Sequence, residues 1–341
     1  MTGNQIVVRA ALAAGLKAFF GYPITPSTEI LHFWAKAAEK YPSLSIRQTE
    51  DETSAGFGVC GAVLAGTPAF TATAGPGSVL MQDPLVMAEA MRLPMATIFA
   101  QRGGPSTGTV IYSQQEVNLA CFGGNGEGWR LVYSAASLPE IYHLLIKGVR
   151  LAWRWRFPVI LLIDGYLAKT EMPVRLPDEF VLRSFPAKPI LSERHHHLRN
   201  CYSTEEDLAL VIAKNQQDYQ KMSQAVAEAE MINCFGSRKI IFAHGSVAAA
   251  AKIAVEKLRS KKRSIGLFRP ITLRPFPVKT SRQVLHQAEE IIVVESSAGQ
   301  FLRLIEAELG RFFSQNKIKI SSFLKPAEAI TSEEIINFLH I

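Results

Sequence analysis

Short apolar runs alternate with longer segments of helical period along the first half of the chain. The runs predict strands at Ala18–Tyr22, Leu44–Gln48, Ala69–Thr73, Met95–Gln101, Arg130–Ser134 and Val159–Asp164. The segments between them predict helices at Asn4–Ala14, Ser27–Glu39, Glu52–Leu64, Val79–Arg92 and Leu138–Trp155. Strands and helices that alternate in this way form a mostly parallel sheet covered on both faces, so an α/β fold is expected.

The pattern changes after this unit. Residues 173–200 are rich in Pro, Arg and His without a clear period, and Thr204–Met231 predicts one long polar helix. A second alternating run then predicts strands at Lys239–Ala243, Ser264–Phe268, Glu290–Glu295 and Ile318–Ser322, with helices at Val247–Leu258, Ser281–Gln287 and Gly299–Leu309. We therefore expect a first domain at 1–172, a connecting arm with a long helix at 173–235 and a smaller α/β domain at 236–341.

Composition and charge exclude several classes of protein. The 341 residues correspond to roughly two domains, and 48% hydrophobic with 20% charged residues excludes an intrinsically disordered chain. The net charge of +7 is spread out, and the basic run at 257–263 fits a helix end, so no nucleic-acid partner is expected. No apolar run approaches the ~20 residues that span a bilayer, and no signal peptide is recognisable. We expect a cytoplasmic protein without membrane contact.

The cysteines and histidines do not predict a metal site. Cys60, Cys121, Cys201 and Cys234 form no CxxC pair, so neither a zinc nor an iron–sulfur ligand set is expected, and a reducing compartment is favoured. Cys60 and Cys121 resemble small buried apolar residues. The run His195–His197 lies in the arm, and because adjacent histidines do not readily converge on one ion, a solvated loop is favoured.

Four segments lie where a predicted strand passes into a helix, which is the edge of a parallel sheet where ligands bind. The first, Gly21–Ser27, has two prolines that stiffen the backbone. The second, Gln48–Ala62, opens with three consecutive acids and continues with small residues. Acids suit a helix N-terminus, but one that faces a dry interface could instead share a proton with a basic ring nitrogen.

The other two segments are rich in glycine. Thr71–Ser78, TATAGPGS, lacks both the GxGxxG spacing and the GK[ST] ending of nucleotide-binding loops, although its backbone amides could meet a ligand. In Gln101–Gly108, Arg102 ends a predicted strand. Its guanidinium could hold a carboxylate bidentately, or it could form a structural ion pair with Asp51 or another acid.

Together these segments resemble the alpha subunit of 2-oxoacid:ferredoxin oxidoreductases, in particular the 2-oxoglutarate and branched-chain types. The motifs GNQxxxxAALAAG, FGYPITPS, QxEDE, TATAGPGS, QRGGPSTG and GGNGE occur in this order, followed by RPITLRPFP, VVE and AGQ in the second domain. The resemblance implies a transketolase-like fold, with a pyrimidine-binding domain for thiamine diphosphate (ThDP) and a transketolase-C-like C-terminal domain.

The resemblance also implies a shared active site. The alpha subunit would hold the aminopyrimidine ring of ThDP, while a beta subunit would supply the diphosphate and Mg²⁺ site and a [4Fe-4S] cluster. The chain lacks a GDG…N diphosphate signature, since Ile163-Asp164-Gly165 is not one, and it lacks cluster cysteines. Gamma and delta subunits are possible further partners, and ferredoxin and coenzyme A would act through the complex.

The resemblance assigns roles to individual residues. Related enzymes place the catalytic Glu nine residues before a helix glycine, here Gly61, so Glu52 is expected to hydrogen-bond N1′ of the aminopyrimidine, with Glu50 as the rival. Thr25 and Arg102 are expected to bind the substrate carboxylate. The remaining residues expected to line the cofactor pocket are Tyr22, Pro23, Ile24, Ala74, Gly75, Pro76 and Gly77.

The expected activity is oxidative decarboxylation of a 2-oxoacid to an acyl-CoA, CO₂ and reduced ferredoxin, in the presence of a beta subunit. 2-Oxoglutarate is favoured, and 2-oxoisovalerate and pyruvate are alternatives because 111–115 departs from typical relatives. In this loop Tyr112 or Gln114 could reach a substrate side chain. Two further alternatives are a non-catalytic alpha-like partner, which the joint presence of Glu52, Thr25 and Arg102 disfavours, and a Rossmann-type nucleotide enzyme, which the missing GxGxxG disfavours.

Overall fold

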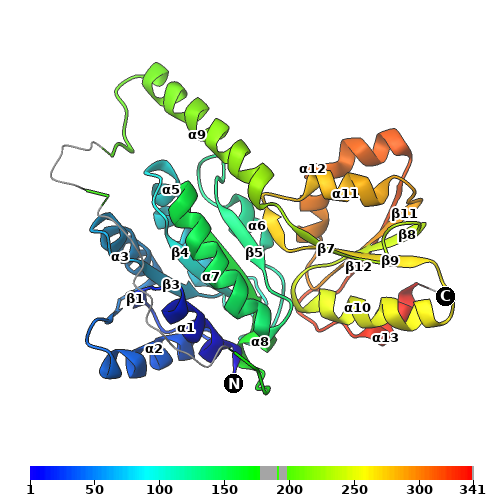
Figure 1. Cartoon of the computed structure of the whole chain (residues 1–341), viewed down its shortest axis with the longest axis horizontal. Coiled ribbons are helices and arrows are strands. Elements are labelled where there is room, and N and C mark those ends of the chain that lie inside the picture. The colour runs from blue at the N-terminus through cyan, green and yellow to red at the C-terminus, as the bar shows by residue number, and fades with distance from the viewer. Residues whose placement is uncertain (177–189, 192–197, 340–341) are drawn as a thin grey trace.

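The computed structural model describes residues 1–176, 190–191 and 198–339, and shows two mainly parallel sheets side by side (Figure 1). The first sheet has the order β10-β5-β6-β4-β3-β1-β2. Its strands are β1 (Ala18–Gly21), β2 (Ser45–Gln48), β3 (Ala69–Thr73), β4 (Ala96–Gln101), β5 (Leu131–Ser134), β6 (Val159–Asp164) and β10 (Thr272–Arg274). The expected α/β class is confirmed.

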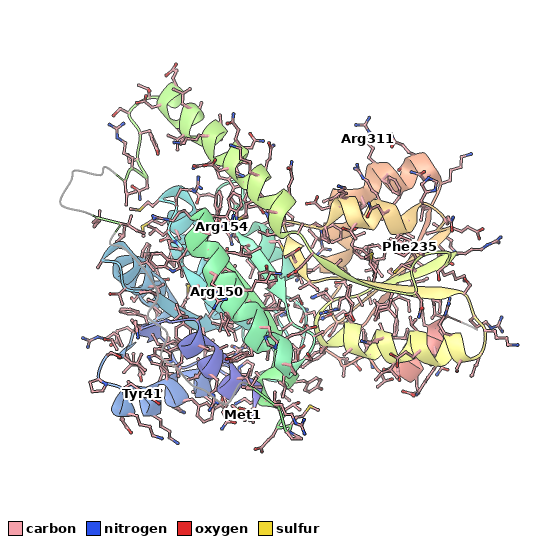
Figure 2. The ribbon with its side chains drawn as sticks, viewed as in Figure 1. Met1, Tyr41, Arg150, Arg154, Phe235 and Arg311 are labelled. Atoms are coloured by element: carbon pink, nitrogen blue, oxygen red, sulfur yellow. The ribbon has the colours of Figure 1, made fainter. Side chains whose placement is uncertain are left out.

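Helices cover both faces of the first sheet. One apolar cluster joins one face to α1 (Gly3–Ala13), α2 (Thr28–Lys40) and α7 (Leu138–Trp155). A second cluster joins the other face to α3 (Glu52–Leu64), α5 (Gln82–Ala90) and α6 (Val117–Phe122). The short helices α4 (Pro76–Leu80) and α8 (Gly165–Lys169) follow β3 and β6. Because α7 is amphipathic, its outer face carries exposed arginines such as Arg150 and Arg154 (Figure 2).

The second sheet has the order β12-β11-β8-β9-β7. Its strands are β7 (Ala229–Ile232), β8 (Lys239–Phe242), β9 (Ile265–Pro270), β11 (Glu290–Glu295) and β12 (Lys319–Leu324). Helices α10 (Gly245–Ser260) and α13 (Ser332–Phe338) pack on one face, and α11 (Val278–Leu285) and α12 (Gln300–Asn316) on the other (Figure 1). The second apolar cluster contains residues of both sheets, so the two halves share part of their core.

Two predicted helices differ from the structure. The helix expected at Val79–Arg92 is divided into α4 and α5, because Pro84 lacks an amide donor and is accommodated in the first turn of a new helix. The helix expected at Thr204–Met231 is α9 (Glu205–Val226), which rises away from the first sheet (Figure 1). Residues 229–232 instead form β7, antiparallel to β9.

One strand from the second half of the chain belongs to the first sheet. The short strand β10 follows β9 in sequence but pairs antiparallel with β5, at the edge of the first sheet. An ion-pair cluster strengthens this junction. The buried guanidinium of Arg269 in β9 donates to both oxygens of Glu140 in α7, at 2.9 and 2.7 Å, and to Glu230 in β7 at 2.8 Å.

Candidate active site

The four segments expected to carry chemistry meet at one edge of the first sheet. Strands β4, β3, β1 and β2 are consecutive neighbours, and all are parallel. Their carboxyl ends therefore lie side by side, and the four loops that leave them are adjacent. The structure brings together the proline-rich turn, the acidic helix start, the glycine turn and the arginine loop, which are far apart in sequence.

Glu52 is the first residue of α3, and its side chain is buried with 4% of its surface exposed. Within the described part of the chain, its Oε1 atom has no hydrogen-bond partner. Burial raises the pKa of Glu52, and the nearby charge of Asp51 adds to this, while Arg102 acts in the opposite direction. A buried carboxyl group without a partner suits a basic ligand atom.

The two other acids of this segment have different surroundings. Glu50 is exposed to solvent. Asp51 is the N-cap of α3, where its Oδ1 accepts the Ser54 amide at 2.7 Å, and this hydrogen bond lowers its pKa. Burial therefore favours Glu52 over Glu50 as the acid that meets the cofactor, and helix capping accounts for Asp51.

Glycine is required at two positions of the turn between β3 and α4. Gly75 has a φ of +54°, which side chains rarely adopt, and a Cβ atom there would overlap the Arg102 guanidinium. A Cβ atom at Gly77 would overlap both Glu52 Oε1 and Thr73 Oγ1. The turn thus leaves room for the two charged side chains. Ala74 is buried, and Pro76 is the first residue of α4.

Arg102 is buried with 4% of its surface exposed, and it reaches the proline-rich turn. Its Nη1 atom donates to the carbonyl oxygen of Thr25 at 2.7 Å, whereas its Nε atom has no partner among the described residues. Within those residues the guanidinium forms no ion pair, so the alternative of a structural pair with Asp51 is wrong. Thr25 is half-buried beside Pro23 and Ile24, and Tyr22 is 40% exposed at the rim.

Glu116 also belongs to this site, and the sequence analysis did not identify it. Its side chain is 3% exposed, and its Oε1 atom accepts the backbone amides of Gly75 at 2.9 Å and Arg102 at 3.1 Å. Its Oε2 atom has no partner in the described structure. Burial raises the pKa of Glu116 to about 7, against the effect of these hydrogen bonds. A single acid at the end of a polar run gave no signal of this contact.

The structure places both Tyr112 and Gln114, which were expected to reach a substrate side chain, in buried positions. Tyr112 is 3% exposed and stacks on Tyr166, with ring centroids 4.4 Å apart. Gln114 is fully buried; its Nε2 donates to the His244 carbonyl at 2.8 Å, and its Oε1 accepts the Ser296 amide at 3.1 Å. Both side chains are engaged in packing, Gln114 against the second half of the chain.

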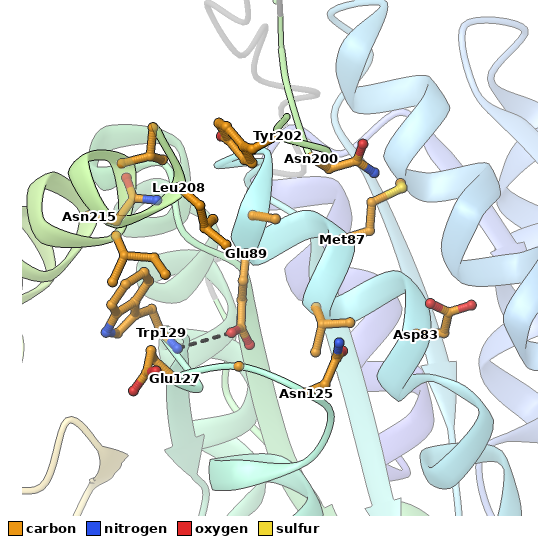
Figure 3. A pocket seen from close by; sticks show the side chains of 15 residues that line it. Asp83, Met87, Glu89, Asn125, Glu127, Trp129, Asn200, Tyr202, Leu208 and Asn215 are labelled. Atoms are coloured by element: carbon orange, nitrogen blue, oxygen red, sulfur yellow. Dashed lines mark hydrogen bonds between the residues drawn. The ribbon is translucent and has the colours of Figure 1, made fainter. Parts of the chain in front are cut away.

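A separate pocket lies between α5, the loop at 125–129 and α9 (Figure 3). Glu89 lines it, and its Oε2 accepts the Trp129 amide at 3.1 Å. None of the predicted site residues contributes to its wall. This pocket is therefore not part of the candidate active site.

The site residues fit the pyrimidine half of ThDP. The unpartnered Glu52 oxygen offers a hydrogen bond to a ring nitrogen, and the glycine turn leaves room for the Glu52 carboxylate. In the described ranges, no group of three or more His, Cys, Asp or Glu side chains is arranged to hold a metal ion, and the four cysteines are free thiols. No helix among the described residues is long and apolar enough to cross a membrane. The predicted run His195–His197 lies outside the described residues.

Comparisons with known proteins identify the class. The family described as "Pyruvate flavodoxin/ferredoxin oxidoreductase, thiamine diP-bdg" matches residues 9–234, and "Pyruvate:ferredoxin oxidoreductase core domain II" matches residues 237–325. The chain is 33% identical to the 2-oxoglutarate synthase subunit KorA of Archaeoglobus fulgidus over 89% of both chains. It is 30% identical to the ketoisovalerate oxidoreductase subunit VorB of Methanothermobacter thermautotrophicus, over 87% of this chain and 86% of that one.

Two solved structures have the same fold as this chain. A 2-oxoglutarate:ferredoxin oxidoreductase from Magnetococcus marinus, with 2-oxoglutarate, coenzyme A and succinyl-CoA bound, matches with a TM-score of 0.84 and 25% identity, over 100% of this chain and 64% of that one. A split-gene transketolase matches in fold alone, with a TM-score of 0.63 and 12% identity, over 99% of this chain and 95% of that one. The chain belongs to the 2-oxoacid:ferredoxin oxidoreductase family. Within it, the chain corresponds to the alpha subunit and carries a ThDP-binding domain, as the motifs predicted.

Proposed function

We propose that this chain is the alpha subunit of an enzyme that oxidatively decarboxylates a 2-oxoacid, with 2-oxoglutarate favoured, to an acyl-CoA, CO₂ and reduced ferredoxin. The observation that carries the proposal is the buried, unpartnered Oε1 atom of Glu52 beside the glycine turn. The 2-oxoglutarate synthase subunit among the relatives supports the substrate.

The proposed role of Glu52 is to share one proton with the aminopyrimidine ring of the cofactor. ThDP, when bound, supplies the carbon nucleophile for the keto carbon of the substrate and takes up the electron pair left by the departing CO₂. Glu52 Oε1 would hydrogen-bond the ring nitrogen N1′. Because burial raises the pKa of Glu52, its carboxyl group holds or shares a proton there more readily than an exposed carboxyl group would. Tyr22, Pro23, Ile24 and the 74–77 turn would line the ring.

Arg102 and Thr25 would bind the substrate. The hydrogen bond from Nη1 to the Thr25 carbonyl orients the guanidinium, and the unpartnered Nε atom remains free to donate to a carboxylate. A buried cation in this position selects acids over neutral ketones or aldehydes. It must not bind the carboxylate more tightly in the ground state than in the transition state, because that group is lost as CO₂.

A beta subunit would complete the site. Several apolar side chains at the rim are exposed, namely Tyr22, Val79, Leu80, Val110 and Ile111. A partner that covers them would exclude water and bring the diphosphate and Mg²⁺ site together with a [4Fe-4S] cluster, for which the described residues provide no ligand group. The two electrons would pass one at a time through the cluster to ferredoxin, and coenzyme A would take the acyl group. Gamma or delta subunits and a cytoplasmic location are part of this proposal.

The substrate alternatives are testable together. The ketoisovalerate oxidoreductase subunit among the relatives favours 2-oxoisovalerate as the second candidate, with pyruvate as the third. The experiment co-purifies the chain with its beta subunit and measures CoA-dependent reduction of methyl viologen, with and without ThDP and Mg²⁺. We expect ThDP-dependent reduction, with the highest kcat/KM for 2-oxoglutarate.

Two outcomes would contradict the proposal. An assembled complex that binds ThDP but reduces the dye with none of the three acids would reject the activity. If the chain alone oxidised 2-oxoacids without a beta subunit, the proposed division of the site between two subunits would be wrong.

A further inference from the structure

The carboxylate of Glu116 joins two loops that also meet where the Arg102 side chain lies against Gly75. Its Oε1 atom accepts the Gly75 amide at 2.9 Å and the Arg102 amide at 3.1 Å. Gly75 belongs to the turn that lies against Glu52, and Arg102 begins the loop that reaches Thr25. One buried atom therefore links the loop proposed for the cofactor with the loop proposed for the substrate.

Ordinary structural roles do not account for this carboxylate. Glu116 precedes α6, but its side chain makes no capping hydrogen bond to that helix. No Lys, Arg or His among the described residues lies within ion-pair distance of it. Burial of an acid without a paired cation is costly, and the charge interacts with Arg102 at longer range. The hydrogen bonds from the two backbone amides offset part of this cost.

The segment around Glu116 is itself held by the second half of the chain. Gln115 Oε1 accepts the Gly104 amide at 2.9 Å, and the Gln115 carbonyl accepts from Gln300 Nε2 at 2.7 Å. Gln300 Oε1 in turn accepts the Asn118 amide at 3.0 Å. Glu116 is thus fixed from both sides, so the position of its carboxylate is set before any ligand binds.

We propose that Glu116 is a positioning residue, whose carboxylate holds the glycine turn and the backbone of Arg102 in the relative placement that cofactor and substrate require. It touches neither of them. This role rests on the proposed function for its catalytic consequence, but the placement of the two loops is a property of the chain itself and can be measured without turnover.

Two substitutions of similar volume separate hydrogen bonding from packing. Glu116→Gln keeps an acceptor oxygen for the two amides, whereas Glu116→Met fills the space without one. Hydrogen–deuterium exchange would be followed in the full chain within its complex, at peptides that cover 74–78 and 101–104. We expect Glu116→Met to accelerate exchange at both segments by about tenfold or more, and Glu116→Gln to remain close to the wild-type protein.

A matched control shows whether the effect is local. Glu295 is a second fully buried acid that accepts two backbone amides, from Phe301 and Leu302 at 2.8 Å each. Because the neighbouring Gln300 holds the Glu116 segment, Glu295→Met should accelerate exchange strongly at those amides and affect 74–78 and 101–104 less than Glu116→Met does. If Glu116→Met does not fold, Glu116→Asp keeps the charge but withdraws the oxygens by one methylene, and it should accelerate exchange at both segments.

The kinetic readout tests the consequence for the reaction. Glu116→Met should lower kcat on the order of 10²-fold, and Glu116→Gln should restore most of it at equal thermal stability. Identical exchange and kinetics in the Gln and Met variants would overturn the proposal, because only packing would then matter. If the wild-type complex oxidised no 2-oxoacid, the proposed function would fail, and the exchange data would still decide whether Glu116 holds the two loops.

Discussion

The carboxylate of Glu52 occupies the space that a side chain at position 77 would need. The two residues lie 25 positions apart in the sequence and on different loops. Because Gly77 has no side chain, the Glu52 Oε1 atom can lie against the turn, buried and still without a hydrogen-bond partner in the described structure. The site therefore depends on an acid at position 52 and on the absence of a side chain at position 77, and each can be tested separately.

Glu52→Gln should lower kcat of the reconstituted complex by about 10²–10⁴-fold, because the amide cannot exchange a proton with the ring nitrogen. Glu50→Gln is the matched control, since Glu50 is two residues away and exposed. It should remain near wild-type activity. Steady-state kinetics at saturating ThDP measures both. Equal losses in the two variants would reject the assignment of Glu52.

Gly77→Ala should displace the Glu52 carboxylate and weaken ThDP binding, because a Cβ atom there has no space. Gly61→Ala on the exposed side of α3 meets no atom within 4 Å and should stabilise the chain by about 0.5–1 kcal/mol. ThDP titration of the complex and denaturant unfolding of the chain measure the two effects. Undiminished ThDP affinity in Gly77→Ala would argue against this turn as the ring site.

Arg102→Lys should raise KM for the 2-oxoacid by about 10- to 100-fold, because an ammonium group lacks the planar fork that pairs with a carboxylate. Affinity for ThDP should change less, since Arg102 forms no ion pair with Glu52 among the described residues and the positive charge is retained. The measurement is KM for the acid beside the dissociation constant for ThDP. An unchanged KM would remove Arg102 from the substrate site.

Glu116 should make the stability of the chain depend on pH. Burial raises its pKa from 4.5 to about 7, so the folded state binds a proton more tightly than the unfolded state. The stability that this proton provides is present at low pH and is lost as the pH rises from about 4.5 to about 7.

Glu116→Gln, which cannot titrate, isolates the contribution of Glu116 protonation to stability. Compared with Glu116→Gln, the wild-type chain should lose up to about 3 kcal/mol of unfolding free energy over that interval and change little above it. Denaturant unfolding of both chains at a series of pH values measures the difference. Parallel stability curves for the two chains would show that the carboxyl group does not titrate in this interval.

Glu140→Gln should destabilise the whole chain rather than one half. The substitution replaces the charged partner of the buried Arg269 guanidinium, which would cost about 1–3 kcal/mol. Because β10 extends from the second half of the chain into the first sheet, scanning calorimetry should show one transition that moves to lower temperature. A transition that splits into two would show that the halves unfold independently.

Much of the fold and part of the site could be predicted from sequence. Strands such as Ala69–Thr73 are short apolar runs with helices between them, and their period and length identify them. Glu52 could be proposed as the acid because the signals that point to it are local, namely a helix start and a motif. In both cases the information lies within a few consecutive residues.

The remaining features depend on contacts between distant segments. Glu116 accepts amides 41 and 14 residues away, and nothing next to it in the sequence indicates those partners. The contacts of Gln114 could not be predicted for the same reason, since its partner Ser296 is 182 residues away. Strand β10 has three residues, too few for a periodic signal, and its pairing with β5 depends on how the two halves meet.

Strand β10 also has a consequence for how the protein is made. A chain emerges from the ribosome N-terminus first, and an early domain usually folds before the next is synthesised. Here the edge of the first sheet is supplied by residues 272–274, so β5 stays unpaired on one side until most of the polypeptide has been translated. During that interval the nascent chain exposes a β edge, and its protection depends on the speed of elongation or on a chaperone.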